Sequence, residues 1–326
     1  MSKMLYFLLM KSSILVGGQA VIEGVMMRVP GAYATAVRLK DKTIKVEKHN
    51  FISIIEKYKM NNYIILRGVV HLYESMKMGY KTLDWSANMQ EEINISQPSV
   101  TFVSRIQDFL LSLLSIVFAV GLFLLLPLFL TSFIEPIINQ PILFNIISGL
   151  IRISIFLIYL LLISQLKDVK RLFQYHGAEH KVVYNFESGK ELNIENAKMF
   201  STKHPRCGTS FVFIIMLVTI FSHAILDYIA LLFLDELTIV IRLTLHILFL
   251  PLIAGLGYEV LKFLAKKQSS IIFSSLSRPG LWLQGITTKE PTDNQLEVSL
   301  VALKTAFGDQ ELKNYSGHKF IADAIG

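Results

Sequence analysis

The sequence predicts a mainly α-helical, polytopic membrane protein with four transmembrane helices and a small cytoplasmic α+β domain built from the N-terminal segment. Three observations predict this class. The 326-residue chain is 52% hydrophobic and only 17% charged, which is too apolar for an ordinary soluble domain. Its apolar residues are concentrated in long runs that lack ionised side chains, as bilayer spans require. Lysine and arginine fall almost wholly on one side of these runs.

Residues 1–100 are expected to form the cytoplasmic α+β segment. The pairs Gly17-Gly18 and Pro30-Gly31 are turn signals, and two strand-like runs within residues 34–48 indicate a hairpin. Residues 51–90 are predicted to be helical, because apolar side chains recur there at intervals of three and four.

Four runs are long enough to cross a hydrocarbon core of about 30 Å. They cover residues 109–133, 141–163, 209–226 (or 209–234 if Asp227 lies inside) and 237–258. The first two form a hairpin within residues 101–163. The last two form a second hairpin within residues 209–264, which turns at residues 234–236.

The distribution of basic residues predicts the orientation of these spans. Residues 1–105 hold fourteen lysines and arginines, the loop 164–208 holds eight, and the tail from residue 262 holds eight. The loop 134–140 and the turn 235–236 hold none. By the positive-inside rule, both termini and the loop 164–208 are therefore cytoplasmic, and the protein is a multi-pass protein of a bacterial inner membrane.

Net charge and cysteine content restrict the partners. The formal charge of +7 matches the positive-inside rule, so the lipid bilayer is the expected partner and no nucleic acid is expected. The single cysteine, Cys207, excludes an intrachain disulfide and fits a reducing compartment.

Two arginines lie inside predicted spans. In lipid, Arg152 and Arg242 would each cost about 2.5–3.5 kcal/mol, so both should face protein or water. Arg242 and Asp227 fall toward the outer half of the membrane and can pair, as a structural ion pair or as part of an ion pathway. His223 and His246 also lie within spans, where packed, hydrogen-bonded roles are expected.

The residues that indicate chemistry follow the second span. His176 and His180 are four residues apart, so on a helix both imidazoles project from one face and can chelate one ion. Glu179 is placed to take a proton from metal-bound water and is the expected catalytic base. The order H-x-x-E-H is that of inverse zincins.

Three further residues are candidates to complete a metal shell. His204 and Cys207 follow in the same loop, and a histidine three residues before a cysteine can bind a borderline-soft ion such as Zn²⁺. Glu259 lies at the cytoplasmic end of the fourth span, and inverse zincins take their third ligand from a downstream glutamate. A divalent metal, with zinc favoured, is therefore the expected cofactor. The alternative is a set of surface or hydrogen-bonded histidines with no ion and a buried Cys207.

The tail, residues 265–326, is expected to be cytoplasmic. Residues 278–282 (Arg-Pro-Gly-Leu-Trp) indicate a turn with an interfacial aromatic side chain, and residues 296–307 indicate a short amphipathic helix. The residues from 308 onward are expected to be weakly ordered.

Several sequence blocks together resemble the bacterial membrane family called domain of unknown function 1385. The blocks are GGQAVIEGVMMR at 17–28, HGAEHK at 176–181, HPRCG at 204–208, AGLGYE at 254–259, PGLWLQ at 279–284 and Glu290-Pro291. They occur in order along nearly the whole chain. Members of that family are often labelled predicted metal-dependent enzymes, so the resemblance implies such an activity, with no established reaction.

The block from Glu23 to Arg28 allows two interpretations. Its opposite charges, glycine and methionines could line a substrate groove over the metal. They could equally form a buried ion pair that holds the strands to the helices.

The expected function is metal-dependent hydrolysis at the cytoplasmic membrane surface, acting on a membrane-associated peptide or a lipid-linked substrate. Two other classes stay open. One is a transporter or channel component, which with four spans would need a homo-oligomer. The other is a non-catalytic scaffold with a structural metal, for which a closed four-ligand shell would argue.

Overall fold

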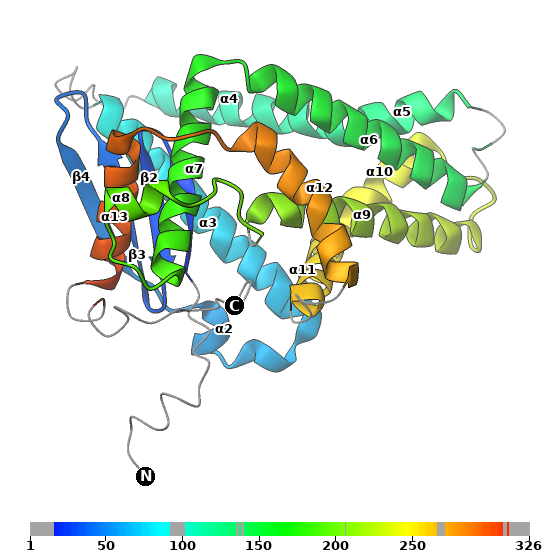
Figure 1. Ribbon diagram of the computed structural model, residues 1–326. Coiled ribbons are helices and arrows are strands. Elements are labelled where there is room, and N and C mark those ends of the chain that lie inside the picture. Colours follow the sequence, from blue (N-terminus) through cyan, green and yellow to red (C-terminus); the bar gives the residue numbers. More distant parts are fainter. Residues whose placement is uncertain are drawn as a thin grey trace, which may run out of the picture.

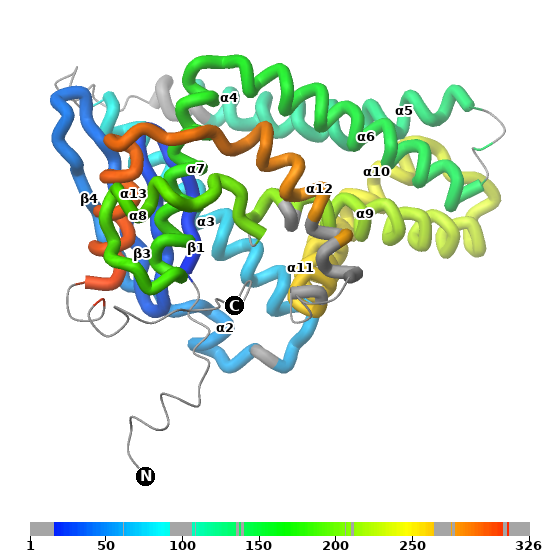
Figure 2. Tube along the Cα trace, in the orientation of Figure 1, coloured from blue at the N-terminus to red at the C-terminus, as the bar shows by residue number. Residues whose placement is uncertain are grey.

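The computed structural model describes residues 16–91, 102–134, 137, 140–205, 207–265, 271–308 and 312. These residues are mainly helical and include one four-stranded antiparallel sheet near the N-terminus. The sheet stands at one end of the molecule, and long helices extend away from it (Figures 1 and 2). The predicted fold class is confirmed to this extent.

The sheet is a meander in the order β1-β2-β3-β4. Its strands are β1 (Gly17–Val21), β2 (Gly24–Val29), β3 (Ala32–Arg38) and β4 (Ile44–Asn50). The predicted hairpin is confirmed as β3 and β4, and the predicted Pro30-Gly31 turn joins β2 to β3, with Gly31 at φ +79°. The predicted turn at Gly17-Gly18 is wrong. Both glycines lie within β1, and at Gly18 the strand comes so close to Glu179 of a neighbouring helix that a Cβ atom would not fit.

Both faces of the sheet are covered by helices, as Figure 1 shows. One face packs on α7 (Lys167–Glu187) and α13 (Asp293–Phe307), and the other packs on α3 (Ile64–Glu91). The N-terminal segment alone therefore does not build this part of the molecule, contrary to the prediction. The physical reason is that β2 and β3 bury side chains on both faces, and each face needs a covering layer.

Four further helices lie around these layers: α2 (Ile54–Lys57), η1 (Met60–Asn62), α8 (Ile194–Lys198) and α12 (Ile271–Thr287). Helix α8 packs on α7 and α13, α2 and η1 contact α3, and α12 packs on α9 (Gly208–Leu231). The predicted helix at 296–307 is confirmed as α13, which begins earlier, after a capping box between Thr292 and Gln295. The predicted turn at 278–282 is wrong, because α12 continues through it with Pro279 inside the helix. The weak order predicted from residue 308 onward concerns mostly residues outside those that the structure describes.

The long apolar helices match the predicted spans. They are α4 (Phe102–Val120), η2 (Gly121–Leu125) and α5 (Leu126–Ser132), then α6 (Pro141–Ile163), α9 (Gly208–Leu231), α10 (Ile239–Leu248) and α11 (Leu250–Ala265). Among the described residues, three helices are long and apolar enough to cross a membrane, or four if α10 and α11 form one bent span. The predicted span at 237–258 corresponds to the bent pair of α10 and α11. It bends by 55° near Pro251, whose nitrogen has no proton for a helical hydrogen bond.

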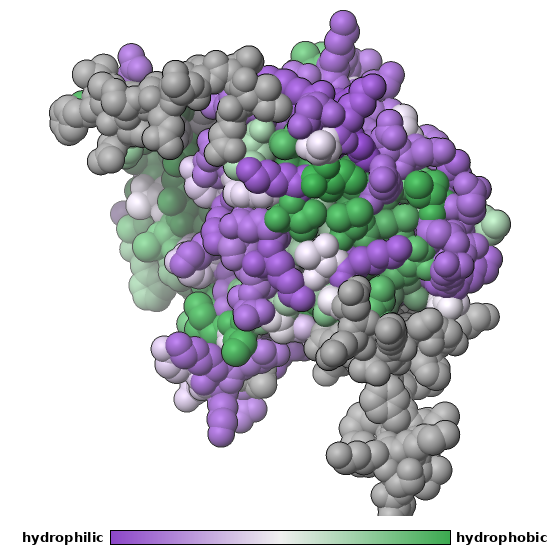
Figure 3. Space-filling model, turned by 90° about the vertical axis from the view of Figure 1, so that its left-hand side faces the viewer, coloured by the Kyte–Doolittle hydropathy of each residue, from purple (hydrophilic) through white to green (hydrophobic). Residues whose placement is uncertain are grey.

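Apolar and polar surfaces are segregated along the molecule. Many large apolar side chains of α4 and α6 are exposed, for example Phe109, Leu114 and Ile142. Viewed from the sheet end, the surface is mostly hydrophilic, with a smaller apolar group near its centre (Figure 3). Such a division suits a chain with one part in lipid and one part in water.

Arg152 lies in α6 against the irregular part of the neighbouring helix. Its Nε donates a hydrogen bond of 2.9 Å to the carbonyl oxygen of Phe123 in the π-helical turn η2. Pro127, four residues later, has no N–H to offer that oxygen in an α-helical pattern. The arginine thus faces protein, as the sequence predicts.

Candidate metal centre

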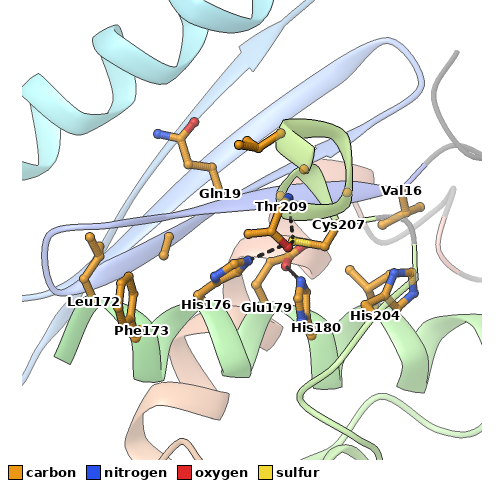
Figure 4. Close-up of a pocket in the computed structure, with 16 residues that line it drawn as sticks. Val16, Gln19, Leu172, Phe173, His176, Glu179, His180, His204, Cys207 and Thr209 are labelled. Carbon is orange, nitrogen blue, oxygen red and sulfur yellow. Dashed lines mark hydrogen bonds and ion pairs between the residues drawn. The ribbon is translucent and has the colours of Figure 1, made fainter. Parts of the chain in front are cut away.

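The helix α7 carries the H-x-x-E-H residues on its buried face. Residues from Phe173 to Phe186 are largely buried against β1, β2 and α13. The rings of His176 and His180 lie one helical turn apart, with centroids 4.5 Å from each other. Both rings therefore project from one side of α7 into the same space (Figure 4), as the spacing predicts.

The ring of His176 is fixed at both nitrogens. Its Nδ1 lies 2.9 Å from the carbonyl oxygen of Thr287 and must donate to it. The Nε2 lone pair is therefore free to accept, and it faces the Sγ atom of Cys207 at 3.2 Å. A backbone carbonyl that holds Nδ1–H is the usual support of a histidine that binds metal through Nε2.

His180 has the same arrangement. Its Nδ1 donates to the carbonyl oxygen of Thr202 at 2.5 Å, which leaves the Nε2 lone pair facing the cavity. This Nε2 lies 3.4 Å from a carboxylate oxygen of Glu179. Burial lowers the pKa of His180 from its usual value, so the imidazole is held in the neutral form that a metal ion requires.

Cys207 brings a sulfur atom to the two histidines from another part of the chain. It is the N-cap residue of α9, and its Sγ accepts from the backbone N–H and the hydroxyl of Thr209. Donors at a helix N-terminus stabilise negative charge on such an atom. One ligand atom from each of His176, His180 and Cys207 lies within 4.8 Å of the others, so the three could hold one metal ion.

Glu179 lines the same cavity, which has a volume of about 450 Å³. The residue is only 5% exposed, and the N–H of Gly18 in β1 donates to its carboxyl group. Burial raises the pKa of Glu179, while nearby His176 and His204 lower it. A carboxyl group with a raised pKa is suited to accept and return a proton at neutral pH.

Two glycines allow the close approaches on which the centre depends. A Cβ atom at Gly177 would lie 2.1 Å from the carbonyl oxygen of Lys289, so a side chain there would push away the segment that supports His176. A Cβ atom at Gly18 would lie 2.8 Å from Cγ of Glu179. A glycine within a helix costs about 1 kcal/mol relative to alanine. The close contact with Lys289 explains why α7 nevertheless has glycine at position 177.

His204 lines the cavity but is not one of the three clustered ligands. Its Nε2 lies 3.5 Å from a carboxylate oxygen of Glu187, and its ring centroid is 5.7 Å from that of His180. Burial lowers its pKa. Its backbone is held by Gln284, which accepts from the His204 N–H at 2.7 Å and donates to its carbonyl at 2.9 Å.

Glu259 does not lie at this centre, contrary to the prediction. Its two carboxylate oxygens accept hydrogen bonds of 2.6 and 2.5 Å from the guanidinium group of Arg67. This pair joins α11 to α3, whose backbones meet closely at Gly68 and Gly255. The carboxylate does not reach the histidines, because α11 packs on α3 and not on α7.

Glu23 and Arg28 are not paired with each other. Glu23 lies in the β1–β2 turn at φ +54° and forms a two-pronged ion pair with Arg171 of α7. Arg28 packs its guanidinium group over the ring of Phe51 at 4.6 Å. An ion pair does hold the strands to a helix, but the partner of Glu23 is Arg171. Neither Glu23 nor Arg28 lines the cavity of the candidate centre.

Sequence reasoning missed the supporting groups of the centre. Thr202 and Thr287 act through backbone carbonyls, which carry no sequence signal. Gln284 and Gly18 lie in the blocks PGLWLQ and GGQ, and these blocks were the available signal for them.

The comparison with known proteins agrees with the resemblance noted in the sequence. A family described as "Protein of unknown function (DUF1385)" matches residues 64–309. The chain belongs to this family. A relative is the "Uncharacterized protein YqhQ" of Bacillus subtilis (strain 168), 32% identical over 301 residues, which cover 87% of this chain and 89% of the relative. No solved structure matches the chain. The DUF1385 match includes all of α7, Cys207 and Gln284.

Proposed function

We propose that this protein is a zinc-dependent hydrolase of the cytoplasmic membrane surface. His176, His180 and Cys207 would hold the ion, and Glu179 would be the general base. The observation that carries the proposal is that three ligand atoms converge beside a buried carboxyl group in one cavity. Three protein ligands leave a fourth position open, which is characteristic of catalytic zinc sites, whereas a structural site would need a fourth ligand.

The proposed reaction is hydrolysis of an amide or ester bond. A bound zinc ion would supply Lewis acidity toward water and the substrate carbonyl. Glu179 takes one proton from water while the oxygen forms a bond to the carbonyl carbon. The bond to the leaving group then breaks, and Glu179 returns the proton to the departing nitrogen or oxygen. Thr287 and Thr202 hold the two imidazoles in the orientation that this chemistry needs.

The position of the centre favours a membrane-associated peptide or a lipid-linked substrate. Cys207 directly precedes α9, an apolar helix long enough to cross a membrane. Apolar side chains of Leu172, Phe173 and Val212 line the cavity beside the polar groups. In the proposed topology, four spans cross a bacterial inner membrane, both termini are cytoplasmic, and the centre lies where α9 enters the lipid.

Metal analysis is the first test of this proposal. The full-length protein in lipid nanodiscs is expected to hold about one zinc per chain. The His176→Ala, His180→Ala double variant should hold none, whereas His49→Ala, a control on β4, should retain it. Cobalt(II) should give a thiolate charge-transfer band that Cys207→Ser abolishes. A wild-type protein without stoichiometric metal would refute the proposal.

The second test separates a catalytic from a structural ion. Glu179→Gln should keep the metal and the cobalt spectrum but lose hydrolysis of acylated fluorogenic peptides and acyl esters presented in nanodiscs. Loss of the metal in Glu179→Gln would instead make Glu179 a ligand. Hydrolysis that survives chelation but is lost in Cys207→Ser would identify Cys207 as a nucleophile and overturn the metal mechanism.

A further inference from the structure

A second group of polar residues lies far from the metal centre, between the apolar helices α6, α9 and α10. The predicted pair of Arg242 and Asp227 is confirmed: Arg242 donates to Asp227, and both side chains are at most 2% exposed. His246 adds a hydrogen bond of 3.0 Å from Nε2 to the other oxygen of Asp227. Asn145 of α6 donates to Asp227 at 2.7 Å. The aspartate thus has three donors.

The two histidines of this group are stacked. The rings of His223 and His246 lie parallel, with centroids 3.6 Å apart and an angle of 7° between their planes. His246 must donate from Nε2 to Asp227, so its Nδ1 carries a lone pair. Within the described part of the chain, neither that Nδ1 nor either nitrogen of His223 has a hydrogen-bond partner.

Three buried imidazole nitrogens without partners are costly. An unsatisfied buried polar atom costs about 1–3 kcal/mol, and buried ionisable groups between membrane helices are rare unless they have a function. The arrangement becomes favourable when a proton is added. A proton on Nδ1 of His246 converts its bond to Asp227 into an ion pair, and this places the aspartate between two cations.

A cavity borders this group at Arg242. It has a volume of about 430 Å³ and is lined by Asp235, Glu236, Thr238 and Arg242. In the proposed topology it opens at the outer face, where its carboxylates favour entry of protons. Arg242 at this cavity contacts Asp227, and Asp227 contacts His246.

The charged groups that surround the histidines oppose one another. Burial opposes a charge on His223, and so does the charge of Arg152 on α6. Asp227 favours a proton on its partner His246, whereas Arg242 on α10 opposes it. On α6, the neutral side chain of Asn145 donates to Asp227, and the neutral side chain of Ser148 is buried. The charge of Asp227 and the opposite charges of Arg242 and Arg152 therefore determine whether a histidine binds the proton. Asp235 and Glu236 add negative charge at the cavity.

We propose that His246 and His223 form a proton-binding site within the membrane-spanning part, loaded from the compartment that the loop carrying Asp235 and Glu236 contacts. The proton leaves hydronium at the cavity, binds Nδ1 of His246 and releases water. This inference uses the proposed span arrangement and does not depend on the metal centre.

Nitrogen NMR of the full-length protein tests the proposal directly. In nanodiscs with ¹⁵N-labelled histidine, one ring of the stacked pair is expected to become doubly protonated between about pH 8 and about pH 5. Signals are assigned by backbone connectivity and by His223→Phe, which keeps an aromatic ring in the stack. His49→Phe, the control, should remove one signal and leave this titration unchanged. Two rings that stay neutral over the whole range would overturn the proposal.

Sidedness is tested in proteoliposomes with different pH inside and outside. A tag at the C-terminus reports the orientation, and a cysteine probe at Asp235 reports which compartment the loop contacts. The histidine signal should follow the pH on the side of the Asp235 probe. A signal that follows the opposite side would overturn the access route. A tag on the same side as the Asp235 probe would contradict the proposed topology but would leave the proton site standing.

Discussion

The side chain of Gln284 holds the backbone of His204 through two hydrogen bonds, one accepted from its N–H at 2.7 Å and one donated to its carbonyl at 2.9 Å. The two residues are 80 positions apart, and Gln284 is fully buried. This contact ties α12 to the loop that carries Cys207, so it positions a candidate ligand without touching the cavity.

Replacement of Gln284 should therefore loosen this loop. Gln284→Ala removes both hydrogen bonds and is expected to lower the free energy of unfolding by about 1–3 kcal/mol. Thermal unfolding in detergent measures the loss, and zinc affinity should fall with it. Gln165→Ala, a change at an exposed glutamine, serves as control and should stay within about 0.5 kcal/mol. Equal effects of the two changes would contradict the role assigned to Gln284.

Gly177 and Gly285 are a matched pair of helical glycines. Alanine at either position gains about 1 kcal/mol of helix propensity. A Cβ at Gly177 meets the Lys289 carbonyl at 2.1 Å, whereas one at Gly285 meets nothing within 4 Å. Gly177→Ala is expected to destabilise the protein and weaken zinc binding, because the Thr287 carbonyl must move away from His176. Gly285→Ala should be neutral or stabilising in the same unfolding assay, and a stabilising Gly177→Ala would show that the contact is absent.

The pair between Arg67 and Glu259 distinguishes a structural carboxylate from a ligand. Both side chains are less than 20% exposed, at 18% and 14%. Glu259→Gln should lower the free energy of unfolding by about 1–3 kcal/mol and leave zinc stoichiometry unchanged. Combining it with Arg67→Met should cost less than the sum of the single changes, because neither charge is then left alone. Loss of zinc in Glu259→Gln would restore Glu259 as a ligand.

Stability should depend on pH through His71 of α3. Burial lowers its pKa from 6.5 to about 4, and nearby Arg28 adds to the effect. Between these two values the unfolded chain binds a proton that the folded chain does not, so stability present above pH 6.5 is lost as the pH falls toward 4. After allowance for partial solvent screening, we expect a loss of about 1–2 kcal/mol relative to His71→Phe. The Tm of both proteins is measured across this pH range, and the wild-type protein should lose stability relative to His71→Phe as the pH falls. A difference in Tm that does not change with pH would contradict the prediction.

Removal of the proposed zinc ion should destabilise the folded protein by mass action. An ion present at one hundred times its Kd stabilises the state that binds it by about 2.7 kcal/mol. A chelator should therefore lower the Tm of the wild-type protein, and added zinc should restore it. The His176→Ala, His180→Ala variant should respond to neither. An equal response of that variant would place the ion elsewhere in the chain.

Local pattern was sufficient for part of the molecule. The apolar runs were predictable from the sequence, because hydrophobicity and length are properties of a single segment. The shared face of His176 and His180 was predictable for the same reason, since it follows from the helical period. The bend between α10 and α11 had a signal in Pro251, but its angle depends on the packing of neighbouring helices.

The pair of Asp227 and Arg242 was predictable from the order of the spans, but most other contacts between separate segments were decided by the tertiary structure. From the sequence, Glu259 and Cys207 were both candidate ligands. In the structure α11 packs on α3, so Glu259 pairs with Arg67, whereas Cys207 at the start of α9 contacts His176. The second layer over the sheet came from α13, more than two hundred residues beyond β3. Such contacts depend on how whole helices pack, and no local pattern of residue types records which helix faces which.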